Sequence, residues 1–462
     1  MHAHRSAALT LLPLAALGAT LATPDTALAR DFQVTTTRDL YDGLCNAHCS
    51  LRDAVDTANH EPGPHRIFLP AGTYTFSLPA PTSQDGEILD EDNNLNGDLD
   101  IGTTLSVIGA GAETTIIDAA RLDRVFEVLA GAELTLQHLT VRNGHSNNGG
   151  GGGIQNHGVT TTRHVVIEKN GSENPGVVSP GGGVANFGRF NLYSSVVREN
   201  GCGGMSNAHG GGIFNADGGT LAVRDSTIID NSVGDEAETA AGGGIYNIGT
   251  ADIARSAFIS NNAQKGGGGA ISNLGTLMLS NSTLSENVTY DPSYEGRGNG
   301  AFINGRPSPT MTAVPEATLV HVTIANNIGG GVRNYGRLVL RNGLIAGNFD
   351  SSHDDPPLPG KNCINLEGAT FLVRGLLLGT GEGNCTAEQY IDNALTFSKV
   401  LLPLADNNGI TQTHGLRQGS PALDAAIGSC SSHDQRGLTR PRDGDGDGVA
   451  VCDLGAFERA RP

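Results

Sequence analysis

The sequence predicts an all-β fold: a parallel β-helix, or solenoid, with a short capping helix at its N-terminal end and an irregular C-terminal cap. The first observation is composition, because 66 glycines and 5% aromatic residues without a single Trp among 462 residues disfavour a compact globular core. The second is a hexapeptide, "GGGIFN" at residues 210–215, which recurs throughout the chain. The third is that each repeating unit holds short extended runs and no helical pattern.

The hexapeptide fixes a period of about 30 residues, which is typical of a repeat architecture. In "TLMLSN" the residues alternate, with Leu277 and Leu279 on one face, as a half-buried strand requires. A strand that pairs with its equivalent in the next unit, always in the same direction, gives a parallel β-helix that advances about 4.8 Å per coil. The hexapeptides and one degraded copy end at Asn156, Asn186, Asn215, Asn247, Asn273, Asn304 and Asn334.

Stacked coils explain the repeated letters. A sharp corner must recur in every coil; glycine permits positive φ, and asparagine tolerates the left-handed region better than other residues. We therefore expect the glycines and asparagines to form corners, and the asparagine side chains to hydrogen-bond along the axis as a ladder. A second asparagine column comprises Asn170, Asn200, Asn231, Asn261, Asn287, Asn327 and Asn348.

A serine column accompanies these ladders at Ser195, Ser226, Ser256 and Ser282. We expect it to face inward with its hydroxyls satisfied by one another, because an unpaired buried hydroxyl is costly. The alternative is an outward polar column.

The first 29 residues are typical of a secretory signal: Arg5, an apolar run from about Ala7 to Leu21, and a small-residue end at Ala29. The run is too short to span a membrane. We expect residues 1–29 to be the signal peptide, 30–64 the N-terminal cap, 65–400 the repeats and 401–462 a separate C-terminal region, in an exported, soluble protein. A net charge of −19 disfavours nucleic acid as a partner.

The N-terminal cap contains a predicted helix in "SLRDAVDTAN". Ser50 and Asp53 form a capping box with Asp in place of Glu. The helix then presents one apolar face, made by Leu51, Ala54, Val55 and Ala58, which can cover the first coil.

Seven cysteines in an exported chain indicate disulfides. We pair Cys45 with Cys49, Cys363 with Cys385, and Cys430 with Cys452, which leaves Cys202 single. The alternative for "CNAHC", a zinc site with His48, lacks a second ligand pair at zinc spacing.

Several motifs resemble a known family. "CSLRDAVDTAN" (residues 49–59), "GDLDI" (97–101), "DRVFEV" (123–128) and the hexapeptides resemble bacterial proteins carrying the CSLREA domain, with Asp53 where that motif has Glu. "NNGITQTHGLRQGSPALDAA" (407–426), "DQRGLTRP" and "CDLGAFE" (452–458) are similar to the choice-of-anchor Q domain. The glycine repeats also look like those of polymorphic outer-membrane proteins.

The resemblance implies a right-handed parallel β-helix on or outside a bacterial cell, and it carries over no catalytic residues. Its members often carry an anchoring signal after the tail domain. This chain stops at Pro462, four residues after Glu458, so we expect free secretion rather than anchoring.

Two acidic loops are candidates for structural calcium. In "DGDGDG", Asp443, Asp445 and Asp447 stand at positions 1, 3 and 5 of a calcium loop, although Leu454 replaces the usual Glu at position 12. A second partial match has its oxygen ligands at Asp92, Asn94, Asn96 and Asp100. The alternative for both is a solvated acidic turn.

Two outward columns are candidate ligand surfaces. The variable hexapeptide position places Phe214 beside Tyr246, either as a platform for sugar rings or, as we favour, as ordinary cross-strand packing. The residue that opens the third run of each unit gives a polar column that a solvated face explains equally well. This column comprises His138, His164, Ser194, Asp225, Arg255, Asn281, His321 and Asn342.

The chain has no P-loop, G-x-S-x-G or H-E-x-x-H motif. We therefore expect a non-enzymatic surface, adhesion or glycan-binding module whose partner is a cell-surface or extracellular polysaccharide. The alternative is a calcium-dependent polysaccharide lyase or a glycoside hydrolase. The first interpretation predicts that no concave face gathers acids and a base.

Overall fold

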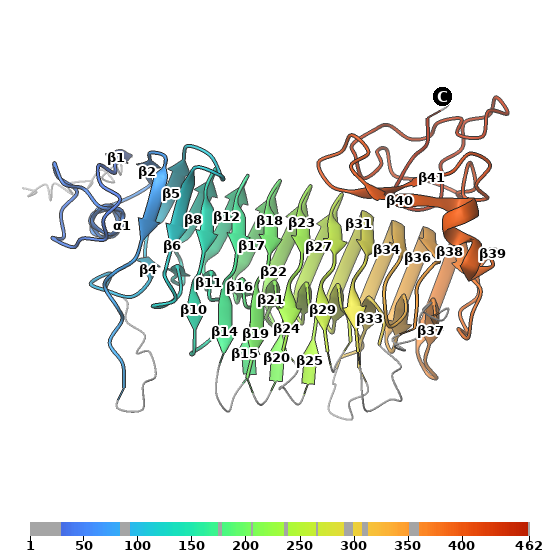
Figure 1. Cartoon of the computed structure of the whole chain (residues 1–462), viewed down its shortest axis with the longest axis horizontal. Helices are drawn as coiled ribbons and strands as arrows, with labels where there is room; N and C mark the ends of the chain where they lie inside the picture. Colours follow the sequence, from blue (N-terminus) through green and yellow to red (C-terminus); the bar gives the residue numbers. More distant parts are fainter. Residues whose placement is uncertain are drawn as a thin grey trace, which may run out of the picture.

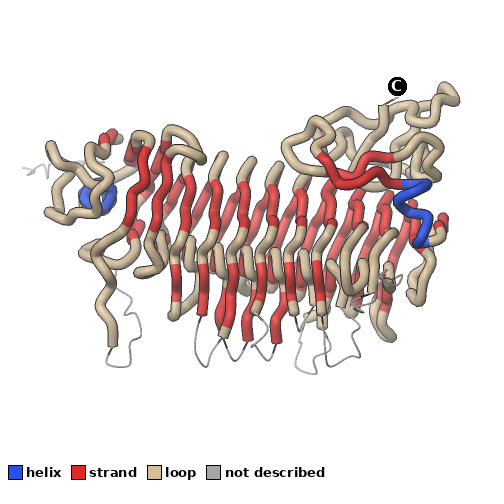
Figure 2. The backbone as a smooth tube through the Cα atoms, in the orientation of Figure 1, coloured by secondary structure: helices blue, strands red, loops and turns tan. Residues whose placement is uncertain are grey.

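The chain winds into the predicted parallel β-helix, with nearly all strands pairing in parallel along one axis (Figure 1). The computed structural model describes residues 29–83, 93–173, 178–204, 207–234, 239–264, 267–290, 299–306, 313–350 and 360–460. Long sheets run the length of the solenoid, and loops connect them at the corners (Figure 2). Equivalent residues of successive coils lie one above another, as the period requires.

The largest sheet combines two successive runs of each coil. Its first run comprises β1 (Arg30–Gln33), β2 (His65–Leu69), β5 (Thr104–Gly109), β8 (Glu133–Gln137), β12 (Val159–Arg163), β17 (Arg189–Tyr193), β22 (Thr220–Arg224), β27 (Thr250–Ala254), β31 (Thr276–Ser285), β34 (Glu316–Ala325), β36 (Arg337–Ile345) and β38 (Thr370–Gly379). Its second run, which β31, β34, β36 and β38 absorb in later coils, comprises β3 (Gly72–Thr75), β6 (Thr115–Asp118), β9 (Thr140–Arg142), β13 (Val166–Glu168), β18 (Val196–Arg198), β23 (Thr227–Ile229), β28 (Ala257–Ile259) and β39 (Gln389–Ile391).

The hexapeptides supply a second sheet, and two smaller sheets line the opposite corner. The hexapeptide sheet comprises β4 (Leu99–Ile101), β7 (Phe126–Val128), β11 (Ile154–Asn156), β16 (Val184–Asn186), β21 (Ile213–Asn215), β26 (Ile245–Asn247), β30 (Ile271–Asn273), β33 (Phe302–Asn304), β35 (Val332–Asn334) and β37 (Cys363–Asn365). The smaller sheets comprise β10 (His145–Ser146), β14 (Gly171–Glu173), β19 (Gly201–Gly203), β24 (Ser232–Val233), β29 (Asn262–Ala263) and β32 (Val288–Thr289), and then β15 (Val178–Pro180), β20 (Asn207–His209) and β25 (Thr239–Ala241).

Both predicted asparagine ladders are confirmed. In the hexapeptide ladder, Asn186 Nδ2 donates to Asn215 Oδ1 and Asn215 Nδ2 to Asn247 Oδ1, each at 2.7 Å. In the second ladder, Asn200 Nδ2 donates to Asn231 Oδ1 at 2.9 Å, and the same oxygen accepts the backbone N–H of Asn200. The ladder asparagines from the hexapeptides are fully buried.

The predicted role of asparagine as a left-handed corner is wrong. The ladder asparagines have no positive φ. Left-handed residues lie instead just before the second ladder, such as Lys169, Glu199 and Asp230 at 53° to 56°, and in the polar column that opens the third run. The hexapeptide glycines do serve as predicted at their first position, where Gly210 has φ +73°. The third glycine suits a close approach, because a Cβ at Gly212 would lie 2.7 Å from the carbonyl oxygen of Gly244 in the next coil, although Ala270 and Ala301 hold this position in two later coils.

The serine column faces inward as predicted, but its hydroxyls do not pair with one another. Ser226 Oγ donates to the carbonyl of Arg224 at 2.7 Å and accepts the backbone N–H of Ser195 at 3.2 Å. Backbone groups therefore satisfy each hydroxyl both as a donor and as an acceptor. The serine side chains are accordingly buried, with 0–2% of their surface exposed.

The N-terminal cap forms the predicted helix α1 (Leu51–Asn59), with both bonds of the capping box between Ser50 and Asp53. Its apolar face is buried and packs against β2 and β4. The buried Arg52 guanidinium donates to the carbonyls of Gly97 at 2.8 Å and Asp98 at 3.0 Å and pairs with Asp39. This contact joins the "CSLRDAVDTAN" and "GDLDI" stretches in the structure.

From the sequence we expected the C-terminal region to cap the end of the solenoid. It lies instead on the flank of the largest sheet (Figure 1). It contains the antiparallel pair β40 (Leu401–Ala405) and β41 (Thr413–Leu416) and follows a short helical stretch at Asn393–Leu395 and Thr396–Val400. His414 contacts Ser285 Oγ at 2.9 Å, which helps to fix the region across β31.

Motif residues of this region form its interior. Arg440 and Glu458, both fully buried in their side chains, pair at 2.6 Å. Burial beneath the region lowers the pKa of His321 to about 3, and burial raises the pKa of Asp453 to about 7. Both side chains are fully buried, because the region excludes water from the sheet that it covers.

The three predicted disulfides are confirmed: Cys45–Cys49, Cys363–Cys385 and Cys430–Cys452. The first excludes the zinc alternative at "CNAHC". Within the described residues Cys202 is free, and burial raises the pKa of its thiol to about 12.

Replacing a ladder amide should destabilise the solenoid. Asn215→Ala removes the ladder acceptor of Asn186 Nδ2 and leaves Asn247 Oδ1 without its ladder donor, so we expect a loss of about 1–3 kcal/mol in the free energy of unfolding. The control Asn191→Ala, on the outer face of β17, should cost less than about 1 kcal/mol. Denaturant unfolding of both variants checks this, and equal losses would contradict the ladder's role.

Candidate functional site: an axial groove and a charged groove

The residue directly after each hexapeptide asparagine forms a column along the solenoid. Its backbone N–H donates to the asparagine carbonyl of the preceding coil, for example Ile248 to Asn215 at 2.8 Å and Leu274 to Asn247 at 2.7 Å. Apart from the buried Ala216 and Gly305, its members are half-buried or exposed. The column comprises His157, Phe187, Ala216, Ile248, Leu274, Gly305, Tyr335 and Leu366.

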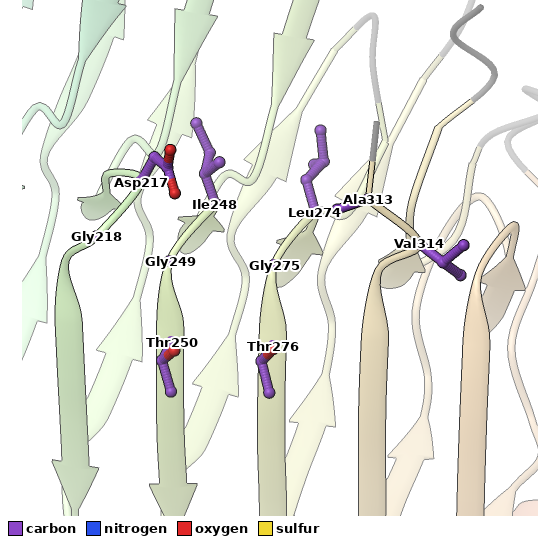
Figure 3. Close-up of a pocket in the computed structure, with 10 residues that line it drawn as sticks. All are labelled: Asp217, Gly218, Ile248, Gly249, Thr250, Leu274, Gly275, Thr276, Ala313 and Val314. Carbon is purple, nitrogen blue, oxygen red and sulfur yellow. The ribbon is translucent and has the colours of Figure 1, made fainter. Parts of the chain in front are cut away.

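Two members of this column, Ile248 and Leu274, line an open groove of about 530 Å³, which we call the axial groove (Figure 3). Ile248 and Leu274 lie side by side, one coil apart, and Val314 continues the apolar lining. Thr250 and Thr276 pair in register and bring hydroxyl groups to the lining. Asp217 lies at one end of the groove.

Glycines line the groove between these side chains. A Cβ at Gly275 would lie 2.1 Å from the carbonyl of Gly249, and one at Gly249 would lie 2.3 Å from that of Gly219. Close stacking therefore favours glycine at these positions of the groove. The groove repeats apolar and hydroxyl groups about every 4.8 Å, which suits an extended ligand with both kinds of surface.

The predicted platform of Phe214 and Tyr246 is not available to a ligand. The two rings do stack as predicted, 5.9 Å apart at 8°, but they are only 7% and 2% exposed. His209 lies 4.2 Å from Tyr246 and covers it. Packing, the interpretation we favoured, is what the structure shows.

The accessible rings belong to the neighbouring column. His157 and Phe187 stack at 4.8 Å and 7° and remain partly exposed. Sequence analysis missed this column because it compared the variable position inside the hexapeptide rather than the position that follows it. Aromatic or large apolar residues at most of these following positions were the available signal.

The polar column of the third run is partly buried. The rings of His138 and His164 stack with their centroids 5.1 Å apart. Arg255 donates from Nε and Nη2 to the two carboxylate oxygens of Asp225, each at 2.6 Å. His321 and Asn342, in contrast, are fully buried under the C-terminal region. A solvated face is therefore the wrong interpretation for the last coils.

A second groove, of about 510 Å³, lies at the opposite corner and is lined by charge. We call it the charged groove. In one coil, alternate residues of the chain line the groove: Lys169, Gly171 and Glu173. In the next coil, the equivalent residues are Glu199, Gly201 and Gly203. The next coil adds Asp230 to the lining, while Arg121 Nη2 contacts His145 Nδ1 at 3.1 Å.

The prediction that no concave face gathers acids and a base is therefore wrong. Lys169 Nζ lies 3.7 Å from Glu199 Oε2 in this groove. Sequence analysis missed the cluster because Lys169, Glu199 and Asp230 occupy left-handed corners beside the second ladder, a column that the repeats did not single out.

Burial and charge shift the pKa values of two lining groups. Burial and then the negative charge of Glu199 raise the pKa of the Asp230 carboxyl, against the lowering effect of Arg198. Burial and then Arg121 lower the pKa of His145, against the raising effect of Glu173. In both cases burial disfavours the charged form of the group.

The structure brings two of the three "DGDGDG" carboxylates together. Asp443 and Asp445 gather with Asp424, with one oxygen of each within 4.8 Å of the others, whereas Asp447 does not belong to this cluster. Asp424 Oδ2 accepts the N–H groups of Gly444 and Asp445 at 3.0 and 2.8 Å. Backbone donors therefore hold the loop in shape.

The second predicted calcium loop is not assembled as expected. Asp92 lies outside the described residues. The Asn94 side-chain amide donates to the carbonyl of Asp100 and accepts the backbone N–H of Asp100. Asn96 is half-buried, and its main-chain carbonyl accepts from Arg52 at 3.2 Å.

The Asp100 carboxylate gathers instead with those of Asp98 and Glu127. All three acids are buried, and Arg124 donates to Asp98 at 3.0 Å and to Glu127 at 2.9 Å. The predicted asparagine ligands Asn94 and Asn96 are not members of this carboxylate cluster.

No family model matches the chain, and no curated protein is significantly similar to it in sequence. Among solved structures, the crystal structure of pectate lyase Pel9A aligns with 93% of this chain and 96% of its own, at 15% identity and a TM-score of 0.41. The catalytic domain of a GH87 alpha-1,3-glucanase in complex with nigerose aligns with 80% of this chain and 68% of its own, at 13% identity and a TM-score of 0.32. Likeness at this level transfers no residue role and no reaction.

Calcium at the "DGDGDG" loop stays a prediction, and it can be measured directly. Adding millimolar calcium should raise the melting temperature by about 1–3 °C, because an ion that binds the folded state stabilises it by mass action. Asp445→Asn should remove this shift, whereas Glu367→Gln, an exposed acid outside the loop, should keep it. A wild-type melting temperature that calcium leaves unchanged would favour the plain acidic turn.

Proposed function

We propose that this protein is an exported β-helix protein that binds a polysaccharide along the axial groove. The observation that carries the proposal is the in-register pairing of apolar and hydroxyl groups across a glycine-lined groove. Ile248 and Leu274 offer apolar surface to the C–H faces of sugar rings, while Thr250 and Thr276 offer hydrogen bonds to their hydroxyl groups. The repeat along the axis suits a polymer better than a small molecule.

Export is part of the same proposal. The N-terminal signal sequence supports it, and so do the three disulfides, which persist in oxidising compartments. In the described portion of the chain, no helix combines the length and apolar character needed to cross a bilayer. We propose a secreted or cell-surface location, which the sequence resemblance to CSLREA proteins also supports.

Introducing charge into the groove wall tests the binding proposal. Ile248→Asp combined with Leu274→Asp should weaken binding to the preferred polysaccharide at least about tenfold, because the apolar contact surface is lost. Affinity electrophoresis against a panel of neutral and acidic polysaccharides measures this. The matched control is Ile410→Asp, which changes an equally apolar but 68% exposed residue of the C-terminal region. Failure of the wild-type protein to bind any polymer would overturn the proposal.

A second candidate function, cleavage of the polysaccharide, is favoured by the charged groove. Glu173 and Asp230 lie on opposite sides of the outward glycine positions, and the raised pKa of Asp230 suits a general acid. In a hydrolytic step, Asp230 would donate its proton to the glycosidic oxygen while Glu173 accepts a proton from water. The water oxygen then bonds to the anomeric carbon as the glycosidic bond breaks.

Cleavage predicts new reducing ends from at least one polymer of the same panel. Asp230→Asn and Glu173→Gln should each reduce the rate at least about 100-fold. Glu286→Gln is the matched control, because Glu286 occupies the same left-handed column outside the groove. Ultraviolet-absorbing unsaturated products would indicate a lyase instead, with a calcium arm to test metal dependence, and no products of either kind would exclude cleavage.

A further inference from the structure

Two arginines stack on neighbouring coils near the C-terminal end of the solenoid. Arg341 on β36 pairs in register with Arg374 on β38, so their backbones lie about one strand spacing, 4.8 Å, apart. Both side chains are exposed. Among the residues that the structure describes, neither forms an ion pair with a carboxylate.

This arrangement is electrostatically unfavourable in the free protein. Like charges directly opposite each other on paired strands destabilise a sheet. The chain as a whole carries a net charge of −19, so carboxylates are abundant, yet none pairs with these guanidinium groups within the described residues. An anionic ligand would relieve the repulsion and find two planar forks of donors suited to carboxylate or sulfate oxygens.

The arginines line a cleft of about 300 Å³ between the sheet and the C-terminal region. Val339 and Leu372 supply apolar surface beside them, and Leu372 is 48% exposed. Ile427 and Ser429 form the facing wall. The cleft therefore combines an apolar strip with two cations, which matches a sugar ring that carries an acidic substituent.

The facing wall is held in place. Ile427 N–H donates to Asn342 Oδ1 at 2.9 Å, and Cys430, one residue beyond Ser429, is locked to Cys452. Gly428 packs directly on Arg374, since a Cβ there would lie 3.0 Å from Cζ. The cleft is thus preformed, and a ligand does not have to order the loop on binding.

The same outward sheet face connects the cleft to the axial groove. Thr276 in the groove lies on β31; β34 and β36 follow it in the pairing order, and Arg341 lies on β36. A polymer bound in the groove can therefore continue across this face to the arginines.

We propose that the cleft binds the carboxylate or sulfate groups of an acidic polysaccharide, and that this selects the class of polymer the protein takes. The inference deepens the proposed function and rests on it. It assigns Arg341 and Arg374 to recognition of the acidic groups and the axial groove to contact with the sugar backbone. Binding to the cleft is accordingly weakened by salt, whereas apolar contact in the groove is not.

The test compares three polymers with the full chain: polygalacturonate, dextran sulfate and neutral dextran. Arg341→Gln combined with Arg374→Gln should weaken binding of the acidic polymers at least about tenfold at low salt and leave neutral dextran unaffected. Arg163→Gln is the matched control, because Arg163 is an exposed arginine of the same sheet and stacks on Tyr193. Thermal unfolding of each variant checks that the fold is kept.

The outcomes separate this inference from the proposed function. If the groove variant loses binding and the arginine variant does not, the cleft proposal is overturned while polysaccharide binding stands. Equal weakening by Arg163→Gln would mean general charge attraction and would also overturn it. Binding of neutral dextran alone overturns the acidic specificity, and binding of none of the wider panel overturns the proposed function itself. Polygalacturonate and dextran sulfate, compared with each other, distinguish carboxylate from sulfate as the recognised group.

Discussion

The structure depends on one constraint: every coil must lie on the next at the spacing of paired strands, with equivalent residues superposed. The ladder of Asn186, Asn215 and Asn247 enforces this register because each amide donates to the next and accepts from the previous one. Gly212 allows the same approach on the backbone side, where a Cβ would collide with a carbonyl of the next coil. Amides and glycines therefore recur in most coils because both suit this close stacking, and the entropy lost by ordering glycine is offset by continuous hydrogen bonding.

This constraint also decides where chemistry can reside. Inward positions are committed to ladders and apolar packing, so variation is confined to outward columns and to the corners beside the ladders. A column converts one position in the repeat into a row of side chains, as with Ile248 and Leu274 in the axial groove. Where an outward position is glycine in two successive coils, as at Gly171 and Gly201, the row becomes the floor of a groove instead.

Features that depend on periodicity or on nearby residues could be predicted from the sequence. The repeat spacing gave the solenoid and both ladders, and local spacing gave the capping box of Ser50 and Asp53 and all three disulfides. The sequence favoured packing for Phe214 and Tyr246 but did not show what covers Tyr246, because His209 reaches it from a strand outside the three-run pattern. The position of the C-terminal region was equally hidden, since its contact between His414 and Ser285 joins residues 129 positions apart without any local signature.

The docking of the C-terminal region on the flank has a consequence for function that capping the end would not have. Asn342 and Arg341 are neighbours in β36, and the left-handed φ of +52° at Asn342 turns its amide toward the docked region, where it anchors Ile427. Arg341 stays on the outward face and enters the cleft that the anchored loop closes. The bond that fixes the region to the solenoid therefore also shapes the wall opposite the two arginines. A terminal cap would have left those arginines on an open sheet, where solvent screens a single ion pair to little net value. The flank position instead gives the two arginines a partly enclosed site beside apolar surface. Binding of a charged sugar there is stabilised both by the ion pairs and by apolar contact.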